Sequence, residues 1–208
     1  MIDKILKRHS VVGVIGNRST GKSLAVLHEL KQLRKKYPKL NISVMGAEPE
    51  TQKVLRTLNI QTIINKVDIL DLKMKDTVIF IDEFALFFDT KSRNKQQDKL
   101  LRFFDRIEHN NCKIIIGTAR EGYFNKFMCA RVTAFLVKQV EYDALVNGTW
   151  IKDKVKSITS LSDYRLQCPI NQMYIVTNKE ELTEIVLCPY DKELDSKKQN
   201  IDLFQNKK

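Results

Sequence analysis

The residues best suited to chemistry form one short segment, GNRSTGKS at positions 16–23. The segment fits the phosphate-loop pattern GxxxxGK[ST], and it lies between a β-branched run and a stretch with helical apolar spacing, as that loop requires. Backbone N–H groups in such a loop cradle phosphates, the lysine reaches the β- and γ-phosphates, and the serine hydroxyl binds Mg2+. ATP and Mg2+ are therefore the predicted cofactors. The predicted nucleotide-binding residues are Gly16, Asn17, Arg18, Ser19, Thr20, Gly21, Lys22 and Ser23.

A second segment, the apolar run TVIFI at positions 77–81, is followed directly by an acidic pair. Such a run is typical of a buried parallel strand, and Asp82 and Glu83 come directly after it. At the end of a strand beside a phosphate loop, Asp82 would bind Mg2+ together with Ser23, and Glu83 would polarise the attacking water. Lys22 and Glu83 are therefore predicted to be catalytic. Because a kinase does not need the second carboxylate, the pair favours ATP hydrolysis over phosphate transfer to a substrate.

A third apolar run, KIIIG at positions 113–117, ends in Thr118. A polar side chain at the end of such a strand can sense the γ-phosphate, which makes Thr118 a candidate catalytic sensor; a cap for the following helix is the equal alternative. Three arginines are candidates for an arginine finger that reaches a neighbouring subunit's nucleotide, and their spacing does not choose among them. They are Arg102, Arg106 and Arg120.

The charge of the chain predicts an affinity for polyanions. The sequence has 36 Lys and Arg against 25 Asp and Glu, a formal net charge of +11, so nucleic acid is the first partner to consider. A Lys-rich surface that only aids solubility explains the charge equally well. The basic loop after the acidic pair contains Lys91, Arg93 and Lys95, which are candidate DNA contacts or parts of an ordinary solvated loop.

The elements that must position these residues alternate along the chain. Apolar runs predict strands, and apolar residues at helical spacing predict helices between them. This alternation predicts an α/β fold in which helices cover both faces of a mostly parallel sheet. The expected strands are 10–16, 41–45, 60–64, 77–81, 113–117 and 132–137, and the expected helices are 22–37, 49–58 and 96–109. The short strand-like segments 164–167, 172–177 and 183–187 would add edge strands or a small appendage.

The 208 residues suffice for one sizeable core. We expect a single domain over residues 1–190, with a core at about 10–140, a small β-rich extension at about 150–190, and a polar tail at 191–208. Four cysteines without metal-ligand spacing predict no zinc site. No apolar run is long enough for a membrane span, and the first residues lack a secretory signal, so we expect a cytoplasmic or virion-associated protein.

In their order along the chain, GNRSTGKS, VIFIDE, KIIIGTAR and VTAFLV resemble the small P-loop ATPases of the FtsK/HerA superfamily. Within it, the chain is most similar to the compact genome-packaging ATPases of tailless, membrane-containing viruses, over about residues 10–140. The resemblance implies the additional-strand, catalytic-glutamate type of P-loop NTPase and a homo-oligomeric ring around double-stranded DNA. At the place where many members carry glutamine, this sequence has Ala119, and residues 108–111 lack the arginine that the family usually has there.

Three functions are compatible with these residues. The leading hypothesis is an ATP-driven motor that translocates double-stranded DNA, in particular a viral genome into a capsid, with capsid vertex proteins as further partners. The alternative is a nucleotide-switched assembly factor that resembles the Zot proteins of filamentous phages. A nucleotide kinase is less favoured because of the Asp82–Glu83 pair.

Overall fold

The computed structural model describes residues 1–17, 19–63, 75–88, 95–118, 131–141, 165–166, 172–177 and 184–187, together with Asp153 and Leu194. Its helices are α1 (Ile2–Arg8), α2 (Lys22–Lys36), α3 (Pro49–Thr57) and α5 (Lys95–His109), with a 3-10 turn η1 (Phe84–Leu86). Its strands are β1 (Val11–Ile15), β2 (Asn41–Met45), β3 (Gln61–Ile63), β4 (Thr77–Ile81), β5 (Lys113–Thr118), β6 (Ala134–Val137), β7 (Val140–Glu141), β8 (Arg165–Leu166), β9 (Gln172–Thr177) and β10 (Glu184–Leu187).

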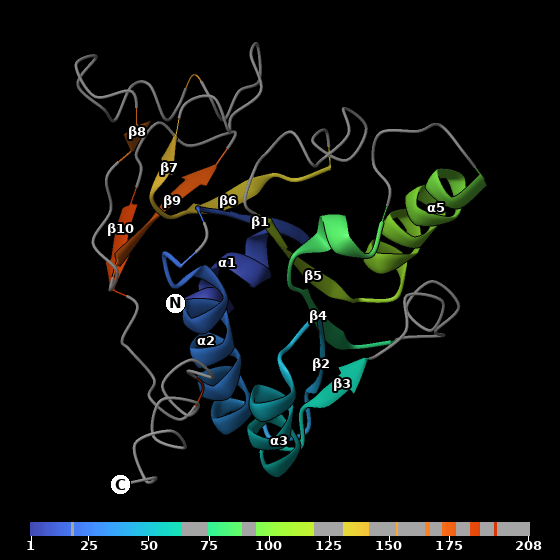
Figure 1. Ribbon diagram of the computed structural model, residues 1–208. Coiled ribbons are helices and arrows are strands. Elements are labelled where there is room, and N and C mark those ends of the chain that lie inside the picture. Colours follow the sequence, from blue (N-terminus) through green and yellow to red (C-terminus); the bar gives the residue numbers. More distant parts are fainter. Residues whose placement is uncertain are drawn as a thin grey trace, which may run out of the picture.

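Eight of these strands form one sheet in the order β10-β9-β6-β1-β5-β4-β2-β3 (Figure 1). The strands from β6 to β3 are all parallel, whereas β9 pairs with β6, and β10 with β9, in antiparallel orientation. The mostly parallel α/β sheet predicted from the sequence is confirmed. Of the C-terminal segments, β9 and β10 are edge strands of this sheet, while β8 pairs with β7 in a separate two-stranded ladder.

Two apolar layers enclose the sheet, which explains why its central strands are apolar along their whole length. β1 and β4 are buried at all five positions, as expected for parallel strands with both faces covered. On one face, α1, α2 and α3 pack through residues such as Leu30 and Leu55; on the other, α5 packs through Phe103, Phe104 and Ile107 (Figure 1). The central strands are therefore held rigidly between the layers, with their carboxyl ends at one edge.

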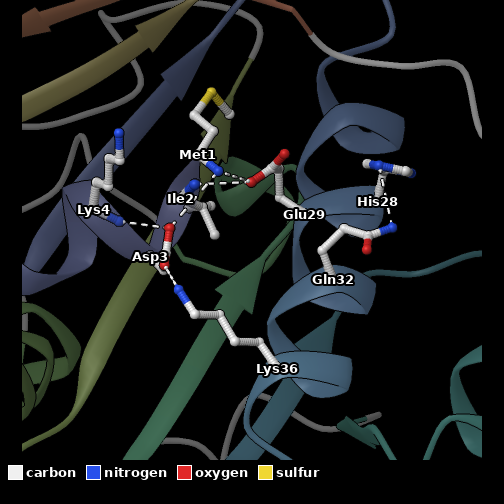
Figure 2. Close-up of polar contacts among 8 residues, drawn as sticks. All are labelled: Met1, Ile2, Asp3, Lys4, His28, Glu29, Gln32 and Lys36. Atoms are coloured by element: carbon white, nitrogen blue, oxygen red, sulfur yellow. Dashed lines mark hydrogen bonds and ion pairs between the residues drawn. The ribbon is translucent and has the colours of Figure 1, made fainter.

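Helix α1 is an element that the sequence analysis did not predict. Its buried residues Ile2, Ile5 and Leu6 have helical spacing and join the layer formed by α2. Figure 2 shows how polar contacts connect the two helices: the Met1 amino group lies 2.9 Å from Glu29 Oε2, and Lys36 Nζ lies 2.5 Å from Asp3 Oδ2. The hydrogen bond from Lys36 lowers the pKa of the Asp3 carboxyl. The first residues therefore belong to the packed layer beside α2.

The other expected helices and strands differ from the structure in their limits. The helix expected at 49–58 ends at Thr57, and the strand expected at 60–64 begins at Gln61 and is described as far as Ile63. Both ends are of the kind that shift by a residue or two, because terminal hydrogen bonds are the weakest of an element. The division into a domain over 1–190 and a tail over 191–208 stays a prediction. Within the described part of the chain, no helix is both long enough and apolar enough to cross a membrane.

Candidate nucleotide-binding site

The phosphate loop follows β1 directly and leads into α2, as the sequence pattern requires. Gly21 has φ +80°, in the left-handed region that favours glycine, and Lys22 is the first residue of α2. Within the loop, the Thr20 hydroxyl donates to the Asn17 carbonyl oxygen at 2.8 Å. The structure therefore places the predicted loop residues between strand and helix; Arg18 alone lies outside the described residues.

Gly16 needs to be a glycine because the segment after β6 approaches it closely. A Cβ atom built on Gly16 would lie 2.6 Å from the Cβ of Lys138. Lys138 follows β6 directly, and its backbone N–H donates to the Ile15 carbonyl oxygen at 2.8 Å. The next carbonyl, that of Gln139, accepts from Asn17 N–H at 2.8 Å. The segment after β6 therefore supports the loop from one side.

The opposite side of the loop meets the carboxyl ends of β4 and β5. Because these strands are parallel to β1 and in register with it, with Ile15 opposite Thr118 and Ile116 opposite Ile81, residues far apart in sequence meet at one edge of the sheet. Lys22 Nζ donates to Glu83 Oε1 at 2.6 Å. The Lys22 side chain is 6% exposed and that of Glu83 is 32% exposed. The structure thus brings the two predicted catalytic residues into direct contact.

Asp82 lies next to this pair and is bonded to the other predicted Mg2+ ligand, Ser23. Burial raises the pKa of the Asp82 carboxyl above its ordinary value; the hydrogen bond from Ser23 and the charge of Lys22 oppose this rise, and the charge of Glu83 adds to it. The Glu83 N–H also donates to Asp82 Oδ1 at 3.0 Å. A hydroxyl and a carboxylate oxygen side by side are the hard oxygen donors that Mg2+ prefers, and a divalent cation would favour the ionised carboxylate. The predicted pair of ligands therefore fits the ion.

The backbone of Glu83 is strained. Its φ of +47° and ψ of +56° are left-handed, a conformation that costs an ordinary residue about 1–2 kcal/mol. The turn η1 begins directly afterwards. Phe84 and Phe88 are buried there, and their stacked rings have centroids 4.6 Å apart. This aromatic anchor holds the strained residue in place, so the Glu83 carboxylate is directed to Lys22 at the expense of local backbone energy.

Thr118 ends β5 beside the phosphate loop, as predicted. Its side chain is fully buried, and its carbonyl oxygen accepts from the Gly16 N–H at 3.4 Å. Thr118 is therefore positioned next to the loop, while its role as a sensor stays a prediction. Ala119, where many FtsK/HerA members have glutamine, lies outside the described residues.

The candidate arginine fingers lie on α5, except Arg120, which falls outside the described residues. α5 leads into β5, and its Asp105 pairs with Arg131, which precedes β6 at the amino edge of the sheet. Arg102 and Arg106 lie about one turn apart on α5. Both are exposed, and the Arg106 Nε donates to the Arg102 carbonyl oxygen at 3.3 Å. The role of Arg102, Arg106 and Arg120 as arginine fingers stays a prediction.

The basic loop is the candidate that the structure tests least. Lys91 and Arg93 lie outside the described residues, and Lys95 is the first residue of α5, with a side chain that is not described. The expectation of DNA contacts at these three positions stays a prediction.

Lys138 is a residue of this site that the sequence analysis missed. It is completely buried although it carries an amine, and it lies against Gly16 of the phosphate loop. Buried lysines are rare and need polar partners. The signal was present in the sequence, because Lys138 ends the apolar strand VTAFLV just as Asp82 ends TVIFI. Each of these strands leads a charged residue to the same edge of the sheet.

Comparison with known proteins agrees with this arrangement. Residues 10–146 match the zonular occludens toxin (Zot) family, whereas no curated protein shows a significant match. Among solved structures, the genome packaging NTPase B204 of Sulfolobus turreted icosahedral virus 2, in complex with ATP-gammaS, has a TM-score of 0.65 at 14% identity and covers 88% of this chain and 98% of that chain. The N-terminal domain of zonular occludens toxin from Neisseria meningitidis has a TM-score of 0.54 at 10% identity and covers 89% and 96%.

A third similar structure contains two ATPase domains, ATPases 2 and 3 of EssC from Geobacillus thermodenitrificans. Its TM-score is 0.57 at 14% identity, and the match covers 95% of this chain and 42% of that chain. At these identities the structures show a shared fold. Together with the family match, they confirm the predicted P-loop ATPase fold of the FtsK/HerA kind.

Proposed function

The chain belongs to the zonular occludens toxin family, and we propose that it binds and hydrolyses ATP at the phosphate loop and uses the reaction to translocate double-stranded DNA. The observation that carries the proposal is the 2.6 Å contact between Lys22 and Glu83. It unites, at one edge of the sheet, a lysine suited to hold phosphate and a carboxylate suited to activate water. ATP hydrolysis needs these two groups within reach of the same γ-phosphate.

Nucleotide binding in this proposal begins with the eight residues from Gly16 to Ser23. Their backbone N–H groups and the first turn of α2 wrap the phosphates, and Lys22 exchanges the Glu83 carboxylate for the β- and γ-phosphates. Thr118 would contact the γ-phosphate from the end of β5, where it adjoins the loop. Lys138 would support the loop through its packing on Gly16.

Ser23 and Asp82 would hold Mg2+, which when bound neutralises part of the phosphate charge. Glu83, released from Lys22, accepts a proton from a water molecule whose oxygen attacks the γ-phosphorus. The bond between the γ-phosphorus and its bridging oxygen breaks, so that ADP and inorganic phosphate leave. Lys22 stabilises the charge that develops on the leaving oxygens.

DNA translocation is the finer part of the proposal. It is supported by the net charge of +11 and by the similarity in fold to B204, which is described as a genome packaging NTPase. We propose a homo-oligomeric ring in which Arg102, Arg106 or Arg120 of one subunit reaches the nucleotide of the next; Arg102 and Arg106 are both exposed on α5. Packaging of a viral genome, with capsid vertex proteins as partners, is the corresponding cellular role.

A second candidate function is favoured by the family match itself. In a Zot-type assembly factor, the nucleotide state would control the binding of a protein partner rather than the movement of DNA. The same Lys22–Glu83 contact would then separate a nucleotide-free state from an ATP-bound state. The two functions differ in one respect that is readily measured, which is the response of ATP turnover to DNA.

The test is steady-state ATP hydrolysis by the wild-type protein and by Glu83→Gln, each with and without long double-stranded DNA at two salt concentrations. We expect Glu83→Gln to bind ATP and to lose about 10²–10⁴-fold in turnover, the usual contribution of a general base. Lys22→Ala is expected to lose ATP binding. Asp76→Asn is the matched control, because it neutralises an exposed carboxylate that precedes β4 at the opposite edge of the sheet.

Each outcome decides between the proposals. A rate that depends on Glu83 and rises with DNA supports the translocating motor, and the rise should weaken at high salt. A rate that depends on Glu83 but ignores DNA supports the Zot-type switch. Equal turnover by wild type and Glu83→Gln would exclude Glu83 as the base.

A further inference from the structure

Basic residues are concentrated at the edge of the sheet opposite the nucleotide site. In a parallel sheet the amino ends of the strands share one edge, and the helices that lead into these strands end there. α1 leads into β1, and α2 leads into β2, so the last turns of both helices lie at this amino edge (Figure 1). These turns contain Lys7 and Arg8 in α1, and Arg34, Lys35 and Lys36 in α2.

The basic side chains of this edge are turned outward. Lys7, Lys35 and Lys39 are exposed, and Lys75, just before β4, is exposed as well. In the part of the chain that the structure describes, none of these four lysines forms an ion pair with an acidic side chain. We call these four residues the amino-edge lysines. Their charges are available to a ligand.

Among the described residues, three acidic side chains close to this edge form polar contacts. Asp3 pairs with Lys36 at 2.5 Å, and Asp76 accepts a hydrogen bond from the Asn111 side chain at 2.7 Å. Arg131 pairs with Asp105. Asp3 and Asp105 therefore offset the charges of Lys36 and Arg131, whereas the exposed Asp76 keeps its charge beside Lys75. Among these described residues the four amino-edge lysines outnumber the one acid without a cationic partner, which gives this edge a positive potential.

The helix dipole explains only part of this concentration. Basic residues are favoured in the last turn of a helix because the carbonyl groups there are unpaired, which accounts for Lys7 and Lys35. Lys39 and Lys75 lie beyond helix ends, so the dipole gives no reason for their charge. An aromatic ring is present too: Tyr37 is 37% exposed, with Lys36 Nζ 5.3 Å from its ring centroid.

We propose that the amino edge of the sheet, with Lys7, Lys35, Lys39 and Lys75, binds the phosphate backbone of double-stranded DNA. Several unpaired lysines along one edge match the regular charges of a duplex and carry no sequence information. An anionic membrane surface is the less suitable ligand, because among the described large apolar side chains only Tyr37 and Leu86 are exposed, and Leu86 lies beside Glu83 at the other edge. The inference rests on the proposed function for its choice of DNA as the polyanion.

This surface differs from the basic loop considered in the sequence, because it lies across the sheet from the nucleotide site. ATP at the carboxyl edge and DNA at the amino edge would contact opposite ends of the same helix, α2, which begins at Lys22 and ends at Lys36. A rigid helix between the two edges would transmit a displacement of the phosphate loop to the DNA.

The experiment measures binding of a fluorescent DNA duplex by anisotropy, without nucleotide, over a series of salt concentrations. The variant Lys35→Gln/Lys39→Gln removes two positive charges from the edge. The control, Lys53→Glu, changes the net charge by the same amount at an exposed position on α3. Thermal unfolding of both variants checks that they are folded, and their basal ATP hydrolysis is expected to equal that of the wild type.

We expect the plot of log K against log[salt] to become less steep by about 1.8 in the double variant, at about 0.9 per lost phosphate contact. The control should keep the wild-type slope. If the wild type binds DNA and the double variant has an unchanged slope, the amino edge is not the DNA site, although the proposed function stands. If the wild type binds no DNA, both the inference and DNA translocation are wrong, while ATP hydrolysis is tested separately. Loss of binding to vesicles that contain phosphatidylserine, with unchanged DNA binding, would identify a membrane as the ligand and overturn the inference.

Discussion

The left-handed backbone at Glu83 allows a sharp test of how the site is built. Replacing Glu83 by alanine or by glycine removes the carboxylate in both cases, so both variants lose the same contact with Lys22. The two variants differ in their fit to φ +47° and ψ +56°. Their difference in stability therefore measures the backbone strain that holds the carboxylate toward Lys22.

The expected magnitude follows from two opposing terms. The left-handed conformation costs alanine about 1–2 kcal/mol and costs glycine almost nothing. Glycine in turn loses about 0.5–1 kcal/mol more backbone entropy on folding. We expect Glu83→Gly to be more stable than Glu83→Ala by about 0.5–1 kcal/mol, and both to lack ATP turnover.

Thermal unfolding without nucleotide is a suitable assay. For a chain of this size, 1 kcal/mol corresponds to about 2–4 °C in Tm, so the glycine variant should unfold about 1–4 °C higher than the alanine variant. Lys53, exposed in the interior of α3, provides the control. There, glycine should be less stable than alanine by about 1 kcal/mol, because the backbone is helical. If alanine is the more stable residue at position 83 as well, the strained turn is not present and the argument about Glu83 fails.

Two further predictions concern the same edge of the sheet. Burial raises the pKa of the Asp82 carboxyl, so the folded wild type loses stability as the pH rises from about 3.8 through that raised pKa. Asp82→Asn should therefore be more stable than the wild type at pH 7, by about 0.5–2 kcal/mol. In urea unfolding without Mg2+, this difference in stability should vanish below about pH 4. A wild type that is more stable than Asp82→Asn at pH 7 would contradict the prediction. Gly16→Ala should lose about 1–3 kcal/mol through overpacking and should lose ATP binding in a titration, because its Cβ would lie 2.6 Å from that of Lys138; unchanged binding would mean that the loop does not need this close approach.

The strands and helices were predictable because the pattern of apolar residues in each depends on which of its faces are buried. The run TVIFI is buried at every position, and the expected limits 77–81 are those of β4. The α2 pattern was equally clear, since its apolar residues face a single layer. The chemistry of Lys22 and Asp82 followed in turn, because a phosphate loop and a strand-end carboxylate have meaning only in this kind of sheet.

Other features depend on contacts that no local pattern contains. The strand order cannot be read from apolar runs that are all alike, because it is decided by pairing across long stretches of chain. Lys138 attains its place beside Gly16 only through the pairing of β6 with β1. The left-handed backbone of Glu83 contradicts the preference of the residue, and such conflicts are expected where a site overrides local propensity.

In the proposed mechanism, the contact between Lys22 and Glu83 couples nucleotide binding to activation of the base. While Lys22 holds Glu83 at 2.6 Å, the carboxylate is occupied and the lysine is neutralised. In the proposed mechanism, a γ-phosphate that takes over Lys22 thereby releases Glu83, so the proposed base would become available only when its substrate is in place. Since the buried lysine always has an anionic partner, neither state leaves a buried charge unpaired, which would otherwise cost several kcal/mol. The exchange of partners is therefore inexpensive in both directions, as a site that must release ADP and bind ATP in every cycle requires.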